Sequence, residues 1–424
     1  MSKFYIKTYG CASNFADSEF VKQTLLDLGY IESELENADF VLVNTCTVKG
    51  PTASKIKHYI LSLKKPKYKI ILLGCLPSDR QFTKEFKDYS MVSPYNIDLI
   101  SEVIFEIQHT KKPVHKLKPK FLDKTQFYFD TKNIAIVQPL IGCLGNCTYC
   151  KTKQAKPLFQ SYPLENILKR IDSYIKKGVK EIWISSEDNA AYGFDIGLNY
   201  IDLLENIEKR FKGKAMFRFG MSNPWLILKN ITKLVEFLKT TKAFYKFLHI
   251  PIQSASNNVL KAMNRPYSEK DLERLFFELR NNFNYRELTL ATDTIVGFPN
   301  ETEEDFEKTK TFSMQYDFLI NNVSQFWPMP FTEAHKMKQL PTQIKKKRSR
   351  ILSGIVRTNS IKLLKSYVGE EISVYFDDID KDKNYLGRTK NYISVILKKP
   401  RKKPEFGVWY KYKVRTLENY HLLI

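Results

Sequence analysis

Three of the six cysteines lie within eight residues, in the stretch Cys143-Leu-Gly-Asn-Cys147-Thr-Tyr-Cys150. Thiolates this close together usually hold a soft metal centre. A structural zinc site normally has four ligands in paired C-x2-C hooks, but this stretch offers three cysteines and no fourth Cys or His nearby in the sequence. Three cysteines on a 4Fe-4S cluster would leave one iron open to a substrate or cofactor. The third alternative is buried thiols without a metal.

The residues before these cysteines fit a strand that runs into a loop, because the apolar run at 134–141 leads through Gly142 into Cys143. The C-x3-C-x2-C spacing in this setting resembles the signature of radical S-adenosylmethionine (SAM) enzymes. That resemblance implies that Cys143, Cys147 and Cys150 hold a 4Fe-4S cluster, and that its open iron chelates the methionine end of SAM.

The other three cysteines, Cys11, Cys46 and Cys75, each follow an apolar extended run. Helical patterns come next, at 18–28 and 53–64, so the segment reads as β-α units around a parallel sheet. Ligands gather beyond the carboxyl ends of such strands. We therefore expect these cysteines to meet in a second three-thiolate site, again with one open iron if it is a cluster. Coincidental burial of three cysteines is the alternative.

The ends of the first of these helices can also be predicted. Asp17 or Ser18 could cap its start, and Gly29 would stop it.

The chain has 424 residues, enough for two to four domains, and a formal net charge of +22. Such a charge favours polyanions, most simply nucleic acid, although a generally lysine-rich proteome would also produce it. The sequence shows no targeting segment and no apolar run long enough to cross a membrane. The six cysteines therefore predict metal ligands in a reducing cytoplasm rather than disulfides.

Strands and helices alternate through residues 130–340, in about six β-α units that predict a partial (βα)6 barrel. Catalytic groups of such barrels lie at the carboxyl ends of the strands. The polar residues expected there are Glu187, Asp188, His249, Gln253, Ser254 and Asp293, with Arg265 shortly beyond.

Several of these side chains suit a zwitterionic nucleoside cofactor such as SAM. Glu187 can accept hydrogen bonds from its ammonium group, and Arg265 can grip its carboxylate. Tyr149 offers a ring face to the adenine, and Gln253 and Asp293 complete the expected contacts. Asp293 could equally be structural or bind the substrate. We interpret His249 as a structural histidine.

A basic connecting helix is predicted at 341–361, and a small antiparallel β-barrel of four or five strands at 362–424. The loop at 398–403 is densely basic, and aromatic residues surround it in the sequence. This combination favours RNA binding through phosphates and stacking. The alternative is a solvated charged hairpin.

The whole chain resembles the radical-SAM methylthiotransferases. Residues 1–122 are expected to form a three-layer α/β domain. They contain the motifs Thr8-Tyr-Gly-Cys11, Asn44-Thr-Cys46-Thr-Val48 and Gly74-Cys75. The barrel segment contains the motifs Pro251-Ile-Gln253-Ser254, Met263-Asn-Arg265 and Asp293-Thr-Ile-Val-Gly-Phe-Pro299. The C-terminal segment resembles the RNA-binding TRAM domain through Gly387-Arg-Thr-x-x-Tyr392.

Two further motifs resemble the archaeal and eukaryotic branch of this family. They are Cys150-Lys-Thr-Lys153 and Ser185-Ser-Glu-Asp-Asn-Ala-Ala-Tyr-Gly193. That branch adds a methylthio group to C2 of N6-threonylcarbamoyladenosine at position 37, beside the anticodon of tRNA. The resemblance implies two 4Fe-4S clusters. The Cys143 cluster makes a radical from SAM, and the cluster on Cys11, Cys46 and Cys75 delivers sulfur that a second SAM methylates.

The implied partners are the tRNA anticodon loop, an electron donor such as ferredoxin or flavodoxin, and a sulfur source, with a monomeric enzyme. Three alternatives stay open from the sequence. Two are methylthiolation of isopentenyladenosine in tRNA and methylthiolation of a ribosomal protein side chain. The third is a metal-stabilised RNA-binding protein without catalysis.

Overall fold

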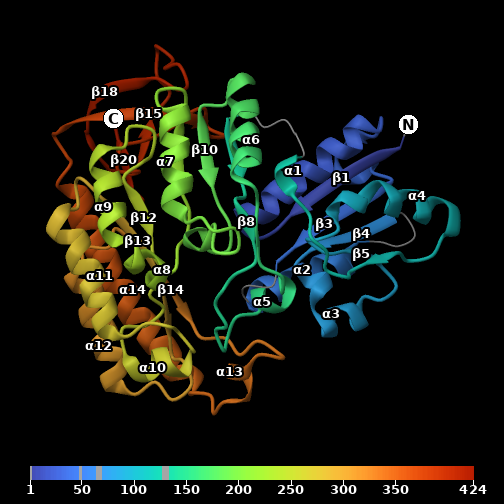
Figure 1. The fold of residues 1–424 in the computed structure, drawn as a ribbon, viewed down its shortest axis with the longest axis horizontal. Helices are drawn as coiled ribbons and strands as arrows, with labels where there is room; N and C mark the ends of the chain where they lie inside the picture. The colour runs from blue at the N-terminus through green and yellow to red at the C-terminus, as the bar shows by residue number, and fades with distance from the viewer. Residues whose placement is uncertain (1, 47–49, 64–68, 127–132) are drawn as a thin grey trace.

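The computed structural model describes residues 2–46, 50–63, 69–126 and 133–424. The expected helix end at Lys64 and domain start at residue 130 lie outside these ranges. Three units follow one another along the chain, and Figure 1 shows the N-terminal unit beside the central one, with the C-terminal sheet at one end of the central unit. None of the helices in the described ranges is both long and apolar enough to cross a bilayer.

The N-terminal unit is a six-stranded parallel sheet in the order β2-β1-β3-β4-β5-β6. Its strands are β1 (Lys3–Thr8), β2 (Ile31–Glu32), β3 (Phe40–Thr45), β4 (Lys69–Gly74), β5 (Ser90–Val92) and β6 (His115–Lys116). Its helices are α1 (Ala12–Asp27), α2 (Gly50–Ser62), α3 (Arg80–Glu85) and α4 (Ile100–Thr110). All of β3 is buried, and its alternate residues belong to two different apolar clusters. Helices therefore cover both faces of the sheet, which confirms the expected three layers.

The predicted start of the first helix was wrong. Helix α1 begins at Ala12, with Cys11 in the N-cap position, rather than near Ser18. Asp17 and Ser18 lie inside the helix and are buried. Ser18 accepts a hydrogen bond from Thr8 Oγ1 at 2.7 Å, and Asp17 pairs with Lys124 Nζ at 2.6 Å. These residues look like caps because Asp and Ser are preferred at helix starts, whereas here their side chains bond to other parts of the fold.

The central unit contains two three-stranded parallel sheets, β11-β10-β7 and β12-β13-β14, joined by a parallel bridge from Phe217 to Phe244. Six parallel strands thus follow in chain order, as predicted for a partial (βα)6 barrel. They are β7 (Ile134–Val137), β10 (Glu181–Ile184), β11 (Met216–Phe219), β12 (Phe247–His249), β13 (Thr289–Val296) and β14 (Ile320–Gln325). The helices are α5 (Thr152–Ala155), α6 (Leu164–Lys176), α7 (Tyr200–Phe211), α8 (Pro224–Lys229), α9 (Ile231–Thr240), α10 (Asn257–Ala262), α11 (Glu269–Asn282), α12 (Glu303–Gln315) and α13 (Glu333–Lys336).

Two expected elements of this unit are divided. The apolar run at 134–141 forms β7 and then β8 (Leu140–Ile141), because Pro139 cannot donate a ladder hydrogen bond between them. Strand β8 pairs antiparallel with β9 (Gln160–Ser161). The helix expected at 227–239 is two helices, α8 and α9, which meet at Asn230.

The basic connecting helix, α14 (Thr342–Lys365), packs against β14 and α12. Its basic run faces two ways. The buried Arg348 donates to Glu301 at 2.6 Å and to Glu303 at 2.9 Å. Lys346, Lys347 and Arg350 are exposed. Part of this run is therefore structural, so the sequence overstates the charge available to a partner.

The C-terminal sheet has the order β18-β15-β16-β17-β20-β19. Its strands are β15 (Glu371–Ile379), β16 (Tyr385–Arg388), β17 (Ser394–Leu397), β18 (Trp409–Lys413), β19 (Thr416–Glu418) and β20 (His421–Leu423). Neighbouring strands are antiparallel, as expected, except that β17 and β20 run parallel.

This sheet caps the barrel at the amino ends of its strands. Tyr375 OH donates to the carbonyl of Lys180, just before β10, at 2.8 Å. Lys246, just before β12, donates its backbone N–H to the carbonyl of Lys390 at 2.9 Å. The C-terminal sheet is therefore the floor of the barrel, at the opposite end from the carboxyl ends of the strands.

Replacing Arg348 by Met should destabilise the protein by about 3–5 kcal/mol, because it leaves Glu301 buried without its partner. Burial raises the pKa of Glu301, so the folded protein holds a proton on this carboxyl at higher pH than the unfolded chain. Stability linked to this group thus rises as pH falls through its folded pKa, and the deficit of the variant should shrink there. Urea unfolding across pH measures both effects. The control is Arg350→Met, an exposed residue of the same helix, and an equal loss in the control would contradict the prediction.

Candidate active site

The N-terminal cysteines come together at one edge of the sheet. Strands β1, β3 and β4 are neighbours, and Cys46 and Cys75 directly follow β3 and β4. Cys11 stands at the start of α1, three residues after β1. A Cβ added to Gly10 would lie 3.2 Å from Cys46 Sγ, so the chain beside Cys11 passes close to the second cysteine. The sequence predicted this convergence.

The surroundings of these thiols suit a metal centre in the chemistry of the donor set. Cys46 and Cys75 are buried, while Cys11 is exposed. Burial raises the pKa of the Cys75 thiol, and the nearby Lys156 ammonium opposes that rise. A buried thiol gives up its proton when it binds a soft metal. The residues therefore fit the cluster that the sequence implies, with an open side at Cys11.

The second cysteine loop is fixed against another loop of the barrel. Thr148 Oγ1 donates to the Ala262 carbonyl at 2.8 Å, and Asn264 Nδ2 donates to the Asn146 carbonyl at 2.8 Å. A Cβ added to Gly145 would lie 3.4 Å from Cys143 Sγ and 3.7 Å from Cys147 Sγ. Two of the three sulfurs therefore face the same glycine.

Two thiols of this loop, Cys143 and Cys150, have raised pKa values because of burial. Burial raises the pKa of Cys143 to about 12, and Asp188 adds to the shift. Among the described residues, no three His, Cys, Asp or Glu side chains converge tightly enough to chelate a single metal ion.

Arg265 is committed to its own chain. Its Nη1 donates to Cys147 Sγ at 3.2 Å, its Nε to Tyr267 OH at 2.6 Å, and its Nη2 to the Pro251 carbonyl at 3.1 Å. In this arrangement the guanidinium braces the cysteine loop. The predicted grip on a SAM carboxylate stays a prediction.

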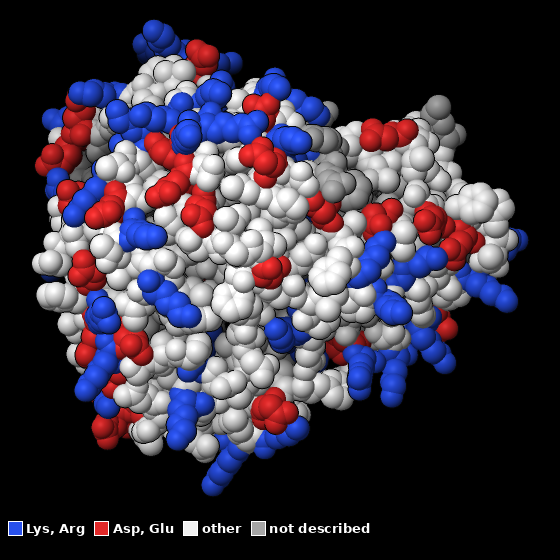
Figure 2. All heavy atoms as spheres, in the orientation of Figure 1, with Lys and Arg blue, Asp and Glu red and all other residues white. Residues whose placement is uncertain are grey.

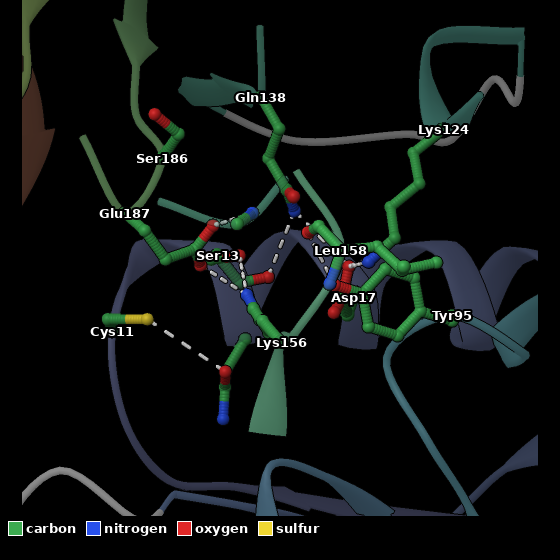
Figure 3. A network of polar contacts seen from close by, with 12 residues as sticks. Cys11, Ser13, Asp17, Tyr95, Lys124, Gln138, Lys156, Leu158, Ser186 and Glu187 are labelled. Atoms are coloured by element: carbon green, nitrogen blue, oxygen red, sulfur yellow. Dashed lines mark hydrogen bonds and ion pairs between the residues drawn. The ribbon is translucent and has the colours of Figure 1, made fainter. Parts of the chain in front are cut away.

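Glu187 lies where the N-terminal unit meets the barrel. Its carboxylate forms a buried ion pair with Lys156 and accepts a hydrogen bond from the Gly142 N–H at 3.1 Å. Lys156 Nζ also donates to Ser13 Oγ, two residues after Cys11, at 2.9 Å. Figure 3 shows Lys156 between Glu187 and Ser13, with Cys11 alongside. One lysine thus links the edge of each cysteine site.

The surroundings of Lys156 favour its protonated, positively charged form. Burial alone would lower the pKa of Lys156, but the Glu187 carboxylate and the sulfurs of Cys75 and Cys11 outweigh it and keep the pKa well above its usual value. The predicted contact between Glu187 and a SAM ammonium would have to compete with this pair.

Asp188 is a functional candidate whose role the sequence left open. It is buried, its Oδ1 accepts from the Asn223 N–H at 3.0 Å, and its Oδ2 has no hydrogen-bond partner among the described residues. Burial raises its pKa to about 6. An orphaned carboxylate oxygen beside Cys143 fits a cationic group of a cofactor. Its place at a strand end was the only signal in the sequence.

A cleft of about 800 Å³ opens beside the cysteine loop at the carboxyl ends of β13 and β14. Four predicted site residues, Tyr149, Cys150, Gln253 and Asp293, line it. Asp293 accepts from Asn322 Nδ2 at 2.8 Å and faces His249 Nε2 at 3.2 Å. Tyr149 packs its edge on Phe298, with ring centroids 6.1 Å apart. Ser254 lies apart from the cleft, bonded to Thr309.

Comparison with known proteins agrees with this geometry. Residues 137–312 match the radical SAM superfamily, and residues 3–93 match the uncharacterized protein family UPF0004. The fold is similar to the radical S-adenosylmethionine methyltransferase TsrM of Kitasatospora setae, with a TM-score of 0.57 at 11% identity over 90% of this chain and 79% of that one.

Curated relatives extend the similarity to the full length. A Pyrococcus horikoshii protein named probable threonylcarbamoyladenosine tRNA methylthiotransferase is 36% identical over 100% of this chain and 99% of its own. The human threonylcarbamoyladenosine tRNA methylthiotransferase is 35% identical over 94% of this chain and 70% of its own.

The barrel with its loop of three cysteines therefore defines a radical SAM enzyme. Its N-terminal unit and the full-length relatives narrow the class further. The chain belongs to the family of threonylcarbamoyladenosine tRNA methylthiotransferases.

Replacing Gly142 by Ala should disrupt the cysteine loop. The residue has φ +88°, and a Cβ there would lie 2.1 Å from the Leu158 carbonyl oxygen. We expect iron in anaerobically prepared protein to fall by about four per chain. The matched control is Gly178→Ala, which has the same φ but open space around the added Cβ. It should cost about 1–2 kcal/mol of stability and keep its iron. Equal iron loss in both variants would show that backbone strain, not the clash, is responsible.

Proposed function

We propose that this chain transfers a methylthio group to C2 of N6-threonylcarbamoyladenosine at position 37 of tRNA. The observation that carries the proposal is that two cysteine triads lie on two units, in a chain that resembles tRNA methylthiotransferases over its full length. The buried Lys156 bonds to Ser13 beside one triad and to Glu187 beside the other. A reaction that makes a radical at one centre and supplies sulfur from another needs two centres near one substrate.

Cys143, Cys147 and Cys150 would hold one 4Fe-4S cluster, and Cys11, Cys46 and Cys75 the other. With SAM bound, these groups supply a carbon-centred radical and a sulfur to be methylated and transferred. The protein contributes binding and orientation. Arg265 braces Cys147, and the unpartnered carboxylate oxygen of Asp188 is available to a cationic cofactor group.

The cleft beside Tyr149 would admit the target base. An adenine within a duplex could not enter it, whereas a loop nucleotide can be splayed out of its stack. Asp293 and Asn322 already bond to each other across the cleft wall, so they present a fixed polar edge to whatever enters.

The remaining partners follow from the chemistry. Cleavage of SAM requires an electron donor such as ferredoxin or flavodoxin, and each turnover consumes a sulfur from an external source. Reduced thiols and oxygen-sensitive clusters agree with a cytoplasmic enzyme. We expect a monomer. The unit boundaries predicted from the sequence are 1–122, 130–340, 341–361 and 362–424. Helix α14 runs to Lys365, so a cut that separates the last unit belongs after this residue rather than after residue 361.

Single substitutions should distinguish the roles of the two cysteine triads. Cys46→Ala should keep about four irons and still cleave SAM reductively, but give no methylthio product. Cys147→Ala should also keep about four irons and do neither. Iron assay, release of 5′-deoxyadenosine and mass spectrometry of tRNA nucleosides measure the three properties. Loss of SAM cleavage in Cys46→Ala would contradict the division of roles.

The substrate is tested by nucleoside mass spectrometry of tRNA from cells with and without the gene. The 2-methylthio derivative of threonylcarbamoyladenosine should disappear when the gene is absent. An unchanged amount of this nucleoside would contradict the proposed substrate. Loss of a methylthio mark on isopentenyladenosine or on a ribosomal protein instead would identify one of the alternative substrates.

A further inference from the structure

Trp327 is a large aromatic side chain that the fold leaves in the open. It follows β14, lines the same cleft as Tyr149 of the cysteine loop, and is 55% exposed. In the described part of the chain its ring has no aromatic neighbour, cation–π partner or hydrogen bond. Tryptophan is highly buried on average. An exposed one in the wall of a cleft points to a ligand that covers it.

The segment that carries Trp327 is fastened to the cysteine loop. Lys151 Nζ donates to the Pro330 carbonyl at 2.7 Å, and Ala334 donates its N–H to the Thr148 carbonyl at 2.9 Å. Phe331 has φ +64°, a conformation that costs a bulky residue on the order of 1–3 kcal/mol. Such strain persists only where surrounding bonds enforce it. The indole is therefore presented by a rigid segment, at a fixed place relative to the radical centre.

Part of the polar lining of the cleft is also unengaged. Five lining side chains make no hydrogen bond among the described residues: Gln253, Thr294, Ser324, Gln325 and Ser349. Ser349 belongs to α14, and the exposed cation Lys346 lies three residues earlier, on the same face of this helix. A ligand that suits this set is planar, carries hydrogen-bonding edges and is attached to negative charge. An unpaired nucleotide of RNA has all three properties.

We propose that Trp327 stacks on an unpaired base of the substrate RNA loop at the rim of this cleft, with the free amides and hydroxyls bonding to base edges. The proposal rests on the proposed function, because it assumes that an RNA loop is the substrate. Stacking on a rigid indole would fix the loop while its target base lies beside the radical centre. Because every base has a ring face, Trp327 positions the loop without reading its sequence.

The test uses the full-length, cluster-loaded protein and an anticodon stem–loop RNA that carries threonylcarbamoyladenosine, without reductant so that no turnover occurs. Trp327→Ala should weaken binding by about 5- to 150-fold, which corresponds to about 1–3 kcal/mol for one stacked base. Trp327→Phe should recover most of the affinity, because it keeps a ring. Phe277→Ala, which removes a 64% exposed aromatic from the outer helix α11, is the matched control and should bind as the wild type does.

A series of stem–loops, each lacking one base of the loop, identifies the stacked nucleotide. For one position the abasic RNA should bind wild type and Trp327→Ala equally, because the partner of the ring is already gone. Equal affinity of Trp327→Ala and wild type for the intact loop would overturn the inference. So would a variant that loses affinity for SAM rather than for RNA, which would assign the indole to the cofactor.

Failure of the inference is distinct from failure of the proposed function. If Trp327→Ala binds the loop normally and wild-type protein still makes the methylthio nucleoside, the inference alone is wrong. If wild-type protein binds no stem–loop and makes no product on tRNA, the proposed substrate is wrong as well.

Discussion

The buried ion pair between Lys156 and Glu187 is the constraint on which the arrangement of the site depends. Taking two charges out of water costs several kcal/mol per ion, so such a pair persists only where geometry and further hydrogen bonds compensate. Here the compensation comes from both sides of a boundary, from Ser13 in the N-terminal unit and from the Gly142 N–H in the barrel. Both members of the pair belong to the central unit, so sliding the N-terminal unit away would leave the buried Lys156 ammonium without its hydrogen bond to Ser13.

A second group of hydrogen bonds and ion pairs lies along the same boundary between the N-terminal and central units. Asp17 of α1 pairs with Lys124 and accepts from Gln138 Nε2 at 3.2 Å, and Gln138 also donates to the Ser13 carbonyl at 3.1 Å (Figure 3). Tyr95 of the N-terminal unit exchanges hydrogen bonds with Leu158 of the barrel. Directional contacts of this kind fix an orientation more sharply than apolar packing does. Two cysteine sites on separate sheets are thereby held in one relative position.

The sequence predicted the parts whose signals are local. Cysteines at strand ends and alternating β-α units are readable because strand periodicity and parallel connection are properties of short segments. The Lys156–Glu187 pair could not be predicted, because 31 positions separate its members and Lys156 lies in no distinctive pattern. Asp17 and Ser18 misled for the same reason, since residues that would cap a helix locally are used here in buried tertiary bonds. Arg265 resembles a ligand for a carboxylate in the sequence, yet a sulfur, a hydroxyl and a carbonyl already occupy its donors.

The position of the C-terminal sheet has a consequence for how an RNA is held. The sheet floors the barrel at the amino ends of its strands, and Figure 2 shows Lys and Arg gathered along the edge of the molecule where that sheet lies in Figure 1. The cleft opens at the opposite end. An RNA in contact with both must span the barrel, so the two contacts act as linked attachments. Their joint affinity depends on whether the stiffness and length of the RNA match that span. The length of the barrel would then set the size of the RNA that can reach both sites. A folded tRNA of the right dimensions would gain affinity from both contacts, whereas a short loop of identical sequence would reach only one.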